Sequence, residues 1–257
     1  MSKISPLAYI DPEAHIGENC EIGPFCFVDK NVTIGDSNVL MNSVTILSGA
    51  RIGNGNTFFP GAVISAVPQD LKFQGEETTA EIGDNNRIRE NVTINRGTAA
   101  RGKTTIGSCN LLMEAVHIAH DASIGNQCII GNTTKIAGEV VVDDHAVISA
   151  SVLIHQFCHM GSYIMIGGGT RTSQDIPPYV MVAREPAQYC GLNLVGLRRA
   201  GFTAQQIDII HDTYRIIYDR SLVLEERIKT VRQLFPDSPE VENITRFVEN
   251  AKRGIIK

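Results

Sequence analysis

Apolar residues recur along this chain with a period of six. Every sixth residue from Ile10 to Ile166 gives 27 positions, of which 24 are Ile, Leu, Val, Phe or Met, the exceptions being Asp70, Glu76 and Ala100. An α-helix would repeat its apolar residues every 3.6 positions, and a half-buried strand every 2. A sustained period of six fits neither, and it is a repeat signature of a parallel β-helix.

Each hexad has the pattern of a short strand followed by a turn. The aliphatic residue is expected to point inward, with a second, smaller inward side chain four positions later, as at Cys20, Asn38 and Ala62. One large and one small side chain per face would fill a narrow prism, so three hexads make a coil of 18 residues. Stacked coils lie about 4.8 Å apart. Residues 18 apart are therefore expected to lie above one another.

Two segments interrupt the hexads. The string "SAVPQDLKFQGEETTA" predicts a loop ejected near residues 66–80, and "GTAARGKT" predicts a shorter one near 97–104. Loops on a rigid scaffold often carry binding residues, although a tolerated insertion is the simpler alternative. The repeat fades after Ile166, and Pro177 and Pro178 are expected to end the coil. We therefore expect a β-helical domain over residues 1–186 and a small α-helical domain over 187–257.

The C-terminal segment predicts three helices. The run Thr203–Gln206 has the form of a capping box that opens a helix reaching about Arg220. Ser221 is expected to cap a second helix, and Ser238-Pro239 to begin a third that ends at Gly254.

Composition limits the classes of partner. The formal net charge is −5, so no nucleic-acid partner is expected. No signal peptide and no apolar run of membrane-spanning length is visible, which predicts a cytoplasmic protein without a membrane span. Four of the six cysteines occupy the small inward slot and no Cys-x-x-Cys pair occurs, so no metal site is expected from them: Cys20, Cys26, Cys128 and Cys158.

Histidines gather in one stretch of the repeats. Five of the seven fall between His117 and His159. His120 and Gly138 are 18 residues apart, so we expect them on neighbouring coils, one above the other. An imidazole beside a glycine amide supplies a base for an alcohol and a donor for an oxyanion, which acyl transfer requires. Asp121 could fix the imidazole tautomer.

Local strings narrow the function further. In order, the chain contains "IGPFC", "PQDLKFQGE", "EIGDNNRIRENVTINRGT", "NLLMEAVHIAHDASIGN", "IHQFC", "QDIPPYV" and "GLNLVGLRRAGF". Together they resemble the UDP-N-acetylglucosamine O-acyltransferase family, hexapeptide-repeat transferases that carry out the first step of lipid A biosynthesis. The resemblance spans essentially the whole chain. It implies a left-handed parallel β-helix with a helical C-terminal domain, assembled as a homotrimer.

The resemblance also implies roles for individual residues. His120 matches the general base, Asp121 its orienting partner, and Gly138 the glycine whose amide binds the oxyanion. The acceptor implied is the 3-hydroxyl of UDP-N-acetylglucosamine, and the donor is a (R)-3-hydroxyacyl chain on acyl carrier protein. No cofactor and no metal are implied. Further residues match substrate contacts: Gln69, Asp70, Lys72, His117, His155, Gln156, Asn193 and Arg199.

Gly168 falls where the family sets acyl length, and a glycine there predicts an open groove and a long hydroxyacyl chain. The chain departs from the family pattern at five positions that bear on nucleotide affinity, on the acyl floor and on the choice between an N-acetyl and an amino-sugar acceptor: Asn95, Glu139, Pro186, Val195 and Ala200.

Two other classes of function remain open at this point. The γ-class carbonic anhydrases place a three-histidine zinc site between left-handed β-helix subunits, and imidazole is a favoured zinc ligand. A zinc-dependent hydratase is therefore one alternative. The other is a non-catalytic β-helix that acts as a scaffold, for which replacing His120 would change nothing.

Overall fold

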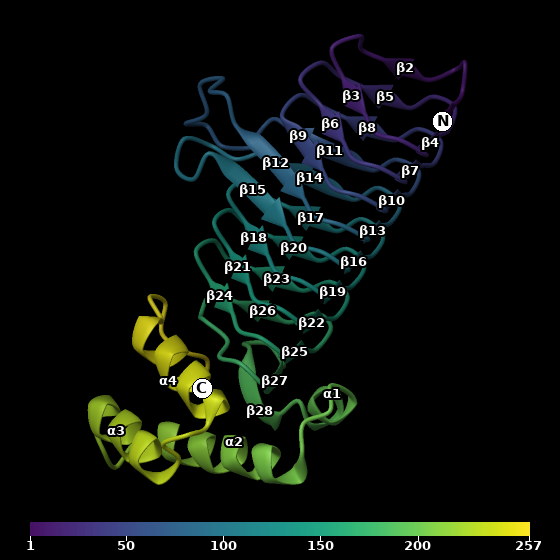
Figure 1. Cartoon of the computed structure of the whole chain (residues 1–257). Helices are drawn as coiled ribbons and strands as arrows, with labels where there is room; N and C mark the ends of the chain where they lie inside the picture. Colours follow the sequence, from purple (N-terminus) through teal and green to yellow (C-terminus); the bar gives the residue numbers. More distant parts are fainter.

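Three parallel sheets wind around a common axis to form a β-helix. The computed structural model describes all residues 1–257, and Figure 1 shows the β-helix above a group of helices. Sheet A has 11 strands: β1 (Lys3–Ile4), β4 (Glu21–Ile22), β7 (Val39–Leu40), β10 (Thr57–Phe58), β13 (Arg87–Ile88), β16 (Leu111–Leu112), β19 (Ile129–Ile130), β22 (Val147–Ile148), β25 (Met165–Ile166), β27 (Val180–Ala183) and β28 (Gln188–Leu192).

The other two faces of the prism are sheets B and C, of nine and eight strands. Sheet B contains β2 (Tyr9–Ile10), β5 (Phe27–Val28), β8 (Thr45–Ile46), β11 (Val63–Ala66), β14 (Thr93–Asn95), β17 (His117–Ile118), β20 (Lys135–Ile136), β23 (Leu153–Ile154) and β26 (Arg171–Thr172). Sheet C contains β3 (His15–Ile16), β6 (Thr33–Ile34), β9 (Ala50–Ile52), β12 (Thr79–Ile82), β15 (Lys103–Ile106), β18 (Ser123–Ile124), β21 (Val141–Val142) and β24 (His159–Met160).

The strand register follows the hexads. Regular coils pair residues 18 apart, as in Ile118 with Ile136. The first loop lengthens this interval to 30, pairing Ile64 with Ile94, and the second lengthens it to 24, pairing Ile94 with Ile118. The insertions thus add 12 and six residues, which are whole numbers of hexads, so the inward positions stay in phase. The predicted β-helix is confirmed.

The interior contains one column of aliphatic side chains from each sheet and a polar column at one corner. From Ile22 onward the aliphatic residue of each hexad is buried, as Ile64, Ile94 and Ile118 are, each with no exposed surface. At the corner between sheets C and A the small slot holds a ladder of asparagines in which each Oδ1 accepts from the next backbone N–H: Asn38, Asn56, Asn86 and Asn110. Buried amides are stable there because their polar groups are hydrogen-bonded.

The coil continues past Pro177 and Pro178, contrary to the expectation that they end it. β27 pairs in parallel with β25, and β28 then turns back antiparallel to β27. Proline interrupts a ladder only where its missing N–H is needed, and here the prolines lie in the turn before β27. The predicted boundary at residue 186 lies in the turn between β27 and β28.

Four helices follow rather than the predicted three. They are α1 (Leu194–Arg199), α2 (Ala204–Ile217), α3 (Leu224–Leu234) and α4 (Pro239–Asn250). The expected capping box of Thr203 and Gln206 opens α2, and Ser238 caps α4. Ser221 does not cap α3, which begins after Val223 without a side-chain cap. Sequence reasoning missed α1, because six residues carry too little periodicity to detect.

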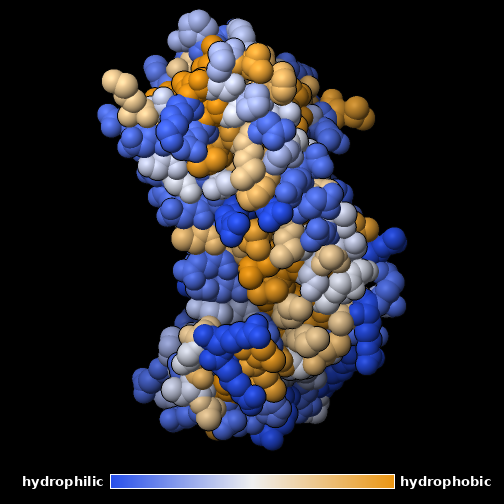
Figure 2. All heavy atoms as spheres, turned by 90° about the vertical axis from the view of Figure 1, so that its right-hand side faces the viewer, coloured by the Kyte–Doolittle hydropathy of each residue, from blue (hydrophilic) through white to orange (hydrophobic).

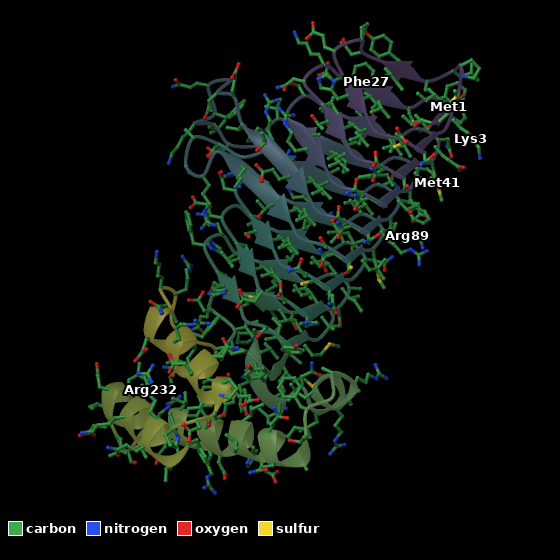
Figure 3. The ribbon with its side chains drawn as sticks, viewed as in Figure 1. Met1, Lys3, Phe27, Met41, Arg89 and Arg232 are labelled. Atoms are coloured by element: carbon green, nitrogen blue, oxygen red, sulfur yellow. The ribbon has the colours of Figure 1, made fainter.

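The helices are attached to one another and to the β-helix by specific contacts. Arg232 of α3, labelled in Figure 3, binds Glu249 of α4 in a two-pronged ion pair at 2.7 and 3.0 Å. Tyr214 of α2 is buried and donates its hydroxyl to the Pro178 carbonyl at 2.6 Å. The helical group therefore caps the C-terminal end of the prism. No helix is long and apolar enough to cross a membrane.

Candidate active site

Both ejected loops leave the same corner of the prism, between sheets B and C. The loop of residues 67–78 joins β11 to β12, and the loop of residues 96–102 joins β14 to β15. They project together beside β12 and β15 in Figure 1. The next corner turns on this edge contain His120, then Gly138, then His155 and Gln156. The topology thus gathers most of the predicted site residues along one edge.

His120 and Asp121 form a hydrogen-bonded pair at this edge. His120 Nδ1 lies 2.8 Å from Asp121 Oδ2, and the side chain of His120 is 19% exposed while that of Asp121 has no exposed surface. The Asp121 carboxylate accepts hydrogen bonds from other donors as well, so it is the acceptor in this pair. The His120 Nδ1 is therefore the nitrogen that carries the proton. Nε2 then keeps its lone pair and makes no hydrogen bond within the chain. The geometry leaves one imidazole nitrogen free to accept a proton.

Gly138 lies directly against the His120 ring. A Cβ atom built on Gly138 would stand 2.8 Å from His120 Cε1 and 2.9 Å from Nε2, so any side chain at this position would force the His120 ring to move. The neighbouring Ala137 and Glu139 N–H groups donate to Ile154 and His120 carbonyls, whereas the Gly138 N–H has no partner in the chain. Gly138 is buried, and an unpaired amide in such a position is unusual. A basic nitrogen and a free amide therefore lie side by side.

The first loop carries Asp70 and Lys72 above this edge. Asp70 Oδ1 accepts the Lys72 N–H at 3.0 Å, and the Lys72 side chain is exposed. The Arg96 guanidinium donates to the Ser48 carbonyl at 3.1 Å and lies 5.5 Å from the centre of the Phe73 ring. Gln69 is exposed on the same loop. The loop thus has a defined shape, with one free ammonium group on its surface.

His117 lies on β17, on the outward face of sheet B beside this corner. Its Nδ1 lies 2.7 Å from the Thr93 hydroxyl. Burial lowers the pKa of His117 below 6.5, and the charges of Lys135 and His120 lower it further. A base with a lowered pKa is neutral at neutral pH. His117 therefore adds no positive charge beside His120 under these conditions.

Three predicted site residues do not join this cluster within one chain. Gly168 lies at the corner between sheets A and B, because it follows β25 of sheet A. Asn193 caps the N-terminus of α1 and donates its side-chain N–H to the Tyr163 carbonyl at 2.9 Å. Arg199 ends the same helix. Figure 1 places α1 at the far end of the molecule from the ejected loops.

The remaining histidines of the cluster are dispersed as well. His159 faces outward from sheet C and binds Asp143 at 2.9 Å, and His145 stacks on Tyr163 at 4.4 Å. No three His, Cys, Asp or Glu side chains within the chain are arranged to hold a metal ion. Each hexad moves the chain to a new face of the prism. Histidines that are close in the sequence therefore lie on different faces and corners.

Sequence reasoning missed two residues that contact the pair. The Thr98 hydroxyl donates to Asp121 at 2.6 Å, and the Arg101 backbone N–H donates to Asp121 at 3.2 Å. The only signal was the interruption of the hexads at residues 97–104, which marked the loop without identifying its contacts.

Solved structures share this fold along its full length. The UDP-N-acetylglucosamine acyltransferase of Bacteroides fragilis matches with a TM-score of 0.97 and 62% identity, covering 99% of this chain and 100% of that chain. This chain belongs to the UDP-N-acetylglucosamine acyltransferase family. Members from Moraxella catarrhalis and Campylobacter jejuni match at 38% and 34% identity with TM-scores of 0.95 and 0.93, each covering 99% of both chains.

The helical end carries the family signature separately. Residues 175–256 match the family model described as UDP-N-acetylglucosamine O-acyltransferase, domain 2. The structure of the UDP-N-acetylglucosamine acyltransferase family therefore extends over the β-helix and the helices of this chain. The resemblance expected from the seven sequence strings is confirmed.

Proposed function

We propose that this protein transfers a (R)-3-hydroxyacyl chain from acyl carrier protein to the 3-hydroxyl of UDP-N-acetylglucosamine, the first step of lipid A biosynthesis. Family membership at 62% identity over 99% of the chain supports this activity. The observation that carries it is the free Nε2 of His120 beside the unpaired Gly138 amide. The two groups supply the base and the oxyanion donor that acyl transfer needs.

The arrangement supports direct transfer without a covalent enzyme intermediate. His120 Nε2 takes the proton of the sugar 3-hydroxyl as its oxygen attacks the thioester carbonyl. The Gly138 N–H stabilises the resulting oxyanion, which collapses to the ester and expels the carrier thiolate. The imidazolium returns its proton to that sulfur, so the neutral base is restored. Asp121 supports the positive charge on His120 between the two steps.

The residues around the pair fit the sugar nucleotide. Lys72 offers an unpaired ammonium on the ejected loop, and a lysine binds phosphate as a point charge. Gln69 and Asp70 on the same loop supply groups for sugar hydroxyls. His117, His155 and Gln156 line the outer face of sheet B and the adjoining turn. We assign these residues to acceptor binding.

Assembly into a homotrimer accounts for the site residues that lie elsewhere. The filled prism offers no interior groove, so the ligands need a cleft between copies. Figure 2 looks onto the side of the molecule where sheet A lies, and apolar side chains gather on it. Five outward residues form a continuous ladder there: Leu111, Ile129, Val147, Met165 and Met181. When two copies pack along this ladder, α1 of one copy, with Asn193 and Arg199, would complete the site at His120 of the other.

A basic α1 also fits an acidic carrier. Arg198 and Arg199 occupy the last turn of α1. Acyl carrier protein is acidic, and complementary charge speeds the encounter of two proteins. We place the docked carrier near α1 of a neighbouring copy.

The position of Gly168 predicts a preference for long acyl chains. Gly168 and His120 lie at the two corners that flank sheet B, three coil steps or about 14 Å apart along the axis. A Cβ atom at Gly168 would meet only the Ala150 carbonyl at 3.3 Å and Ser149 Cβ at 3.9 Å. Replacing Gly168 by Met should fill this space and move the preferred donor to a shorter chain. Competition between donors of different length measures the change, and an unaltered preference would remove Gly168 from the acyl groove.

Replacing Gly138 by Ala is expected to lower kcat by about 100-fold, because the added methyl must displace the His120 ring. The backbone at Gly138 is outside the left-handed region, so alanine itself is tolerated and the thermal midpoint should change little. Steady-state kinetics and thermal unfolding of the same preparation measure both. Parental kcat in a folded variant would show that the ring and the amide do not act together.

A turnover assay distinguishes the proposed activity from the two alternatives. Purified protein receives UDP-N-acetylglucosamine and 3-hydroxyacyl carrier, and release of the free carrier thiol is followed with and without a zinc chelator. The acyltransferase predicts thiol release that needs the sugar nucleotide and persists with chelator. A zinc hydratase predicts chelator-sensitive hydration of carbon dioxide and no thiol release, and a scaffold predicts neither reaction.

A further inference from the structure

We propose that Thr98, in the β14–β15 loop, is a positioning residue that holds the Asp121 carboxylate and thereby fixes the tautomer of His120. This inference rests on the proposed role of His120 as the base. Nothing in the sequence strings assigns Thr98 a role. The inference follows from the hydrogen bonds that converge on Asp121.

The Asp121 carboxylate receives four hydrogen bonds. Oδ2 accepts from His120 Nδ1 at 2.8 Å and from the Thr98 hydroxyl at 2.6 Å. Oδ1 accepts from the backbone N–H groups of Thr98 at 2.9 Å and Arg101 at 3.2 Å. Three of the four donors thus come from one loop. Asp121 is 1% exposed and Thr98 is 6% exposed, so water does not compete for these contacts.

The direction of the hydroxyl bond is determined by its second partner. The Thr98 oxygen accepts the Ala100 N–H at 3.2 Å, so its single proton points toward Asp121 Oδ2. The Asp121 carboxylate is then the acceptor in all four of its hydrogen bonds, and the His120 Nδ1 must be the donor. Nε2 is left unprotonated on the side that faces Gly138. A loop residue therefore sets which imidazole nitrogen is basic.

The same loop is anchored on both sides of the site. The Ala99 N–H donates to Glu76 of the first loop at 3.2 Å. Arg101 reaches the Glu139 carbonyl at 3.4 Å and its carboxylate at 3.7 Å, next to Gly138. Thr98 lies between these anchors, so the loop keeps its hydroxyl in register with Asp121. An exposed loop without these contacts would not hold a buried carboxylate.

Removing the Thr98 hydroxyl should alter catalysis rather than folding. Valine has nearly the same shape and keeps the backbone N–H donor to Oδ1, so Thr98→Val deletes one charge-assisted hydrogen bond. We expect kcat to fall roughly 10- to 100-fold with KM for the sugar nucleotide unchanged. Thr98→Ser should restore activity, and Thr105→Val is the control because the Thr105 hydroxyl contacts Ser123 instead.

The pH profile gives a readout that a purely structural role would not change. The charged and titratable groups facing His120 are Asp121, His117, Glu139 and Arg101. Thr98→Val leaves these in place and makes the Asp121 carboxylate a stronger acceptor for the imidazolium. The acid limb of kcat/KM should therefore move to higher pH in Thr98→Val and return in Thr98→Ser.

Two outcomes would overturn the proposal. One is parental kcat with an unchanged acid limb in Thr98→Val. The other is a loss of activity matched by a lowered thermal midpoint, with an unchanged acid limb. NMR of ¹⁵N-labelled His120 provides a test that does not depend on turnover: the parent should be protonated at Nδ1, and Thr98→Val should show a changed tautomer ratio or pKa. An unaltered His120 spectrum would refute the inference even if the proposed acyl transfer had failed.

Discussion

His120→Ala is expected to lower kcat by roughly 10²- to 10⁴-fold, the contribution typical of a positioned general base. KM for the sugar nucleotide should change little, because the loop carrying Asp70 and Lys72 is untouched. The fold should persist, since Asp121 keeps its bonds to Thr98 and Arg101 after the imidazole is removed. Steady-state kinetics of the variant and the parent measure the effect.

A matched control separates this effect from general loss of a histidine. His15 is exposed on β3, at the opposite end of the β-helix from the helices, and contacts no part of the site. His15→Ala should keep the parental kcat. A positioned general base contributes far more than threefold to the rate. If the activity of His120→Ala stayed within about threefold of the parent, the base would therefore have to be another group.

Placing charges on the apolar ladder of sheet A is expected to separate the proposed homotrimer into monomers and to lower activity at the same time. The double variant Ile129→Glu, Met165→Glu puts two carboxylates on β19 and β25, which are separated by β22 and so do not repel across adjacent strands. Each apolar side chain buried between copies contributes about 1.5–3 kcal/mol, whereas a carboxylate there would be buried unpaired. Light scattering should report a monomer, and kcat/KM should fall roughly 100-fold or more, because the positioning groups of the neighbour are lost.

The control for this variant uses an outward face that is mostly polar, since Val141 is the one apolar residue in this outward row of sheet C: Thr33, Arg51, Glu81, Thr105, Ser123, Val141 and His159. Thr105→Glu, Val141→Glu places two carboxylates on β15 and β21 of sheet C, with β18 between them in the same way. It should remain a trimer and stay active. A sheet A variant that is monomeric and fully active would show that each chain contains a complete site. A sheet A variant that remains trimeric would place the interface elsewhere, for example at the corner where Met41 and Arg89 project in Figure 3.

The hexads predicted the β-helix because inward and outward positions are fixed by spacing alone. The rule that residues 18 apart stack correctly paired His120 with Gly138, since no insertion falls between them. Positions counted in steps of six stay inward on both sides of each loop, because each loop adds a whole number of hexads. This part of the fold depends on local periodicity, which can be recognised in a single sequence.

Other features depend on contacts that periodicity does not encode. The hydrogen bond from Thr98 to Asp121 joins residues 23 positions apart across an interrupted repeat. α1 is too short for a helical pattern. α3 begins at Leu224, after Val223, although Ser221 is the better capping residue by type. Gly168 lies away from His120 because its hexad reaches a different corner of the prism, and Asn193 follows the repeats at the N-terminus of α1.

The measurement that tests the central claim most directly is analysis of the reaction product. Purified protein is given UDP-N-acetylglucosamine and a panel of 3-hydroxyacyl carriers, beside His120→Ala, and the sugar nucleotide is examined by mass spectrometry and NMR. We predict an ester on the 3-hydroxyl, formed by the parent and essentially absent with the variant. No acylated sugar from any donor, with UDP-N-acetylglucosamine or its 3-amino counterpart as acceptor, would contradict the proposed function.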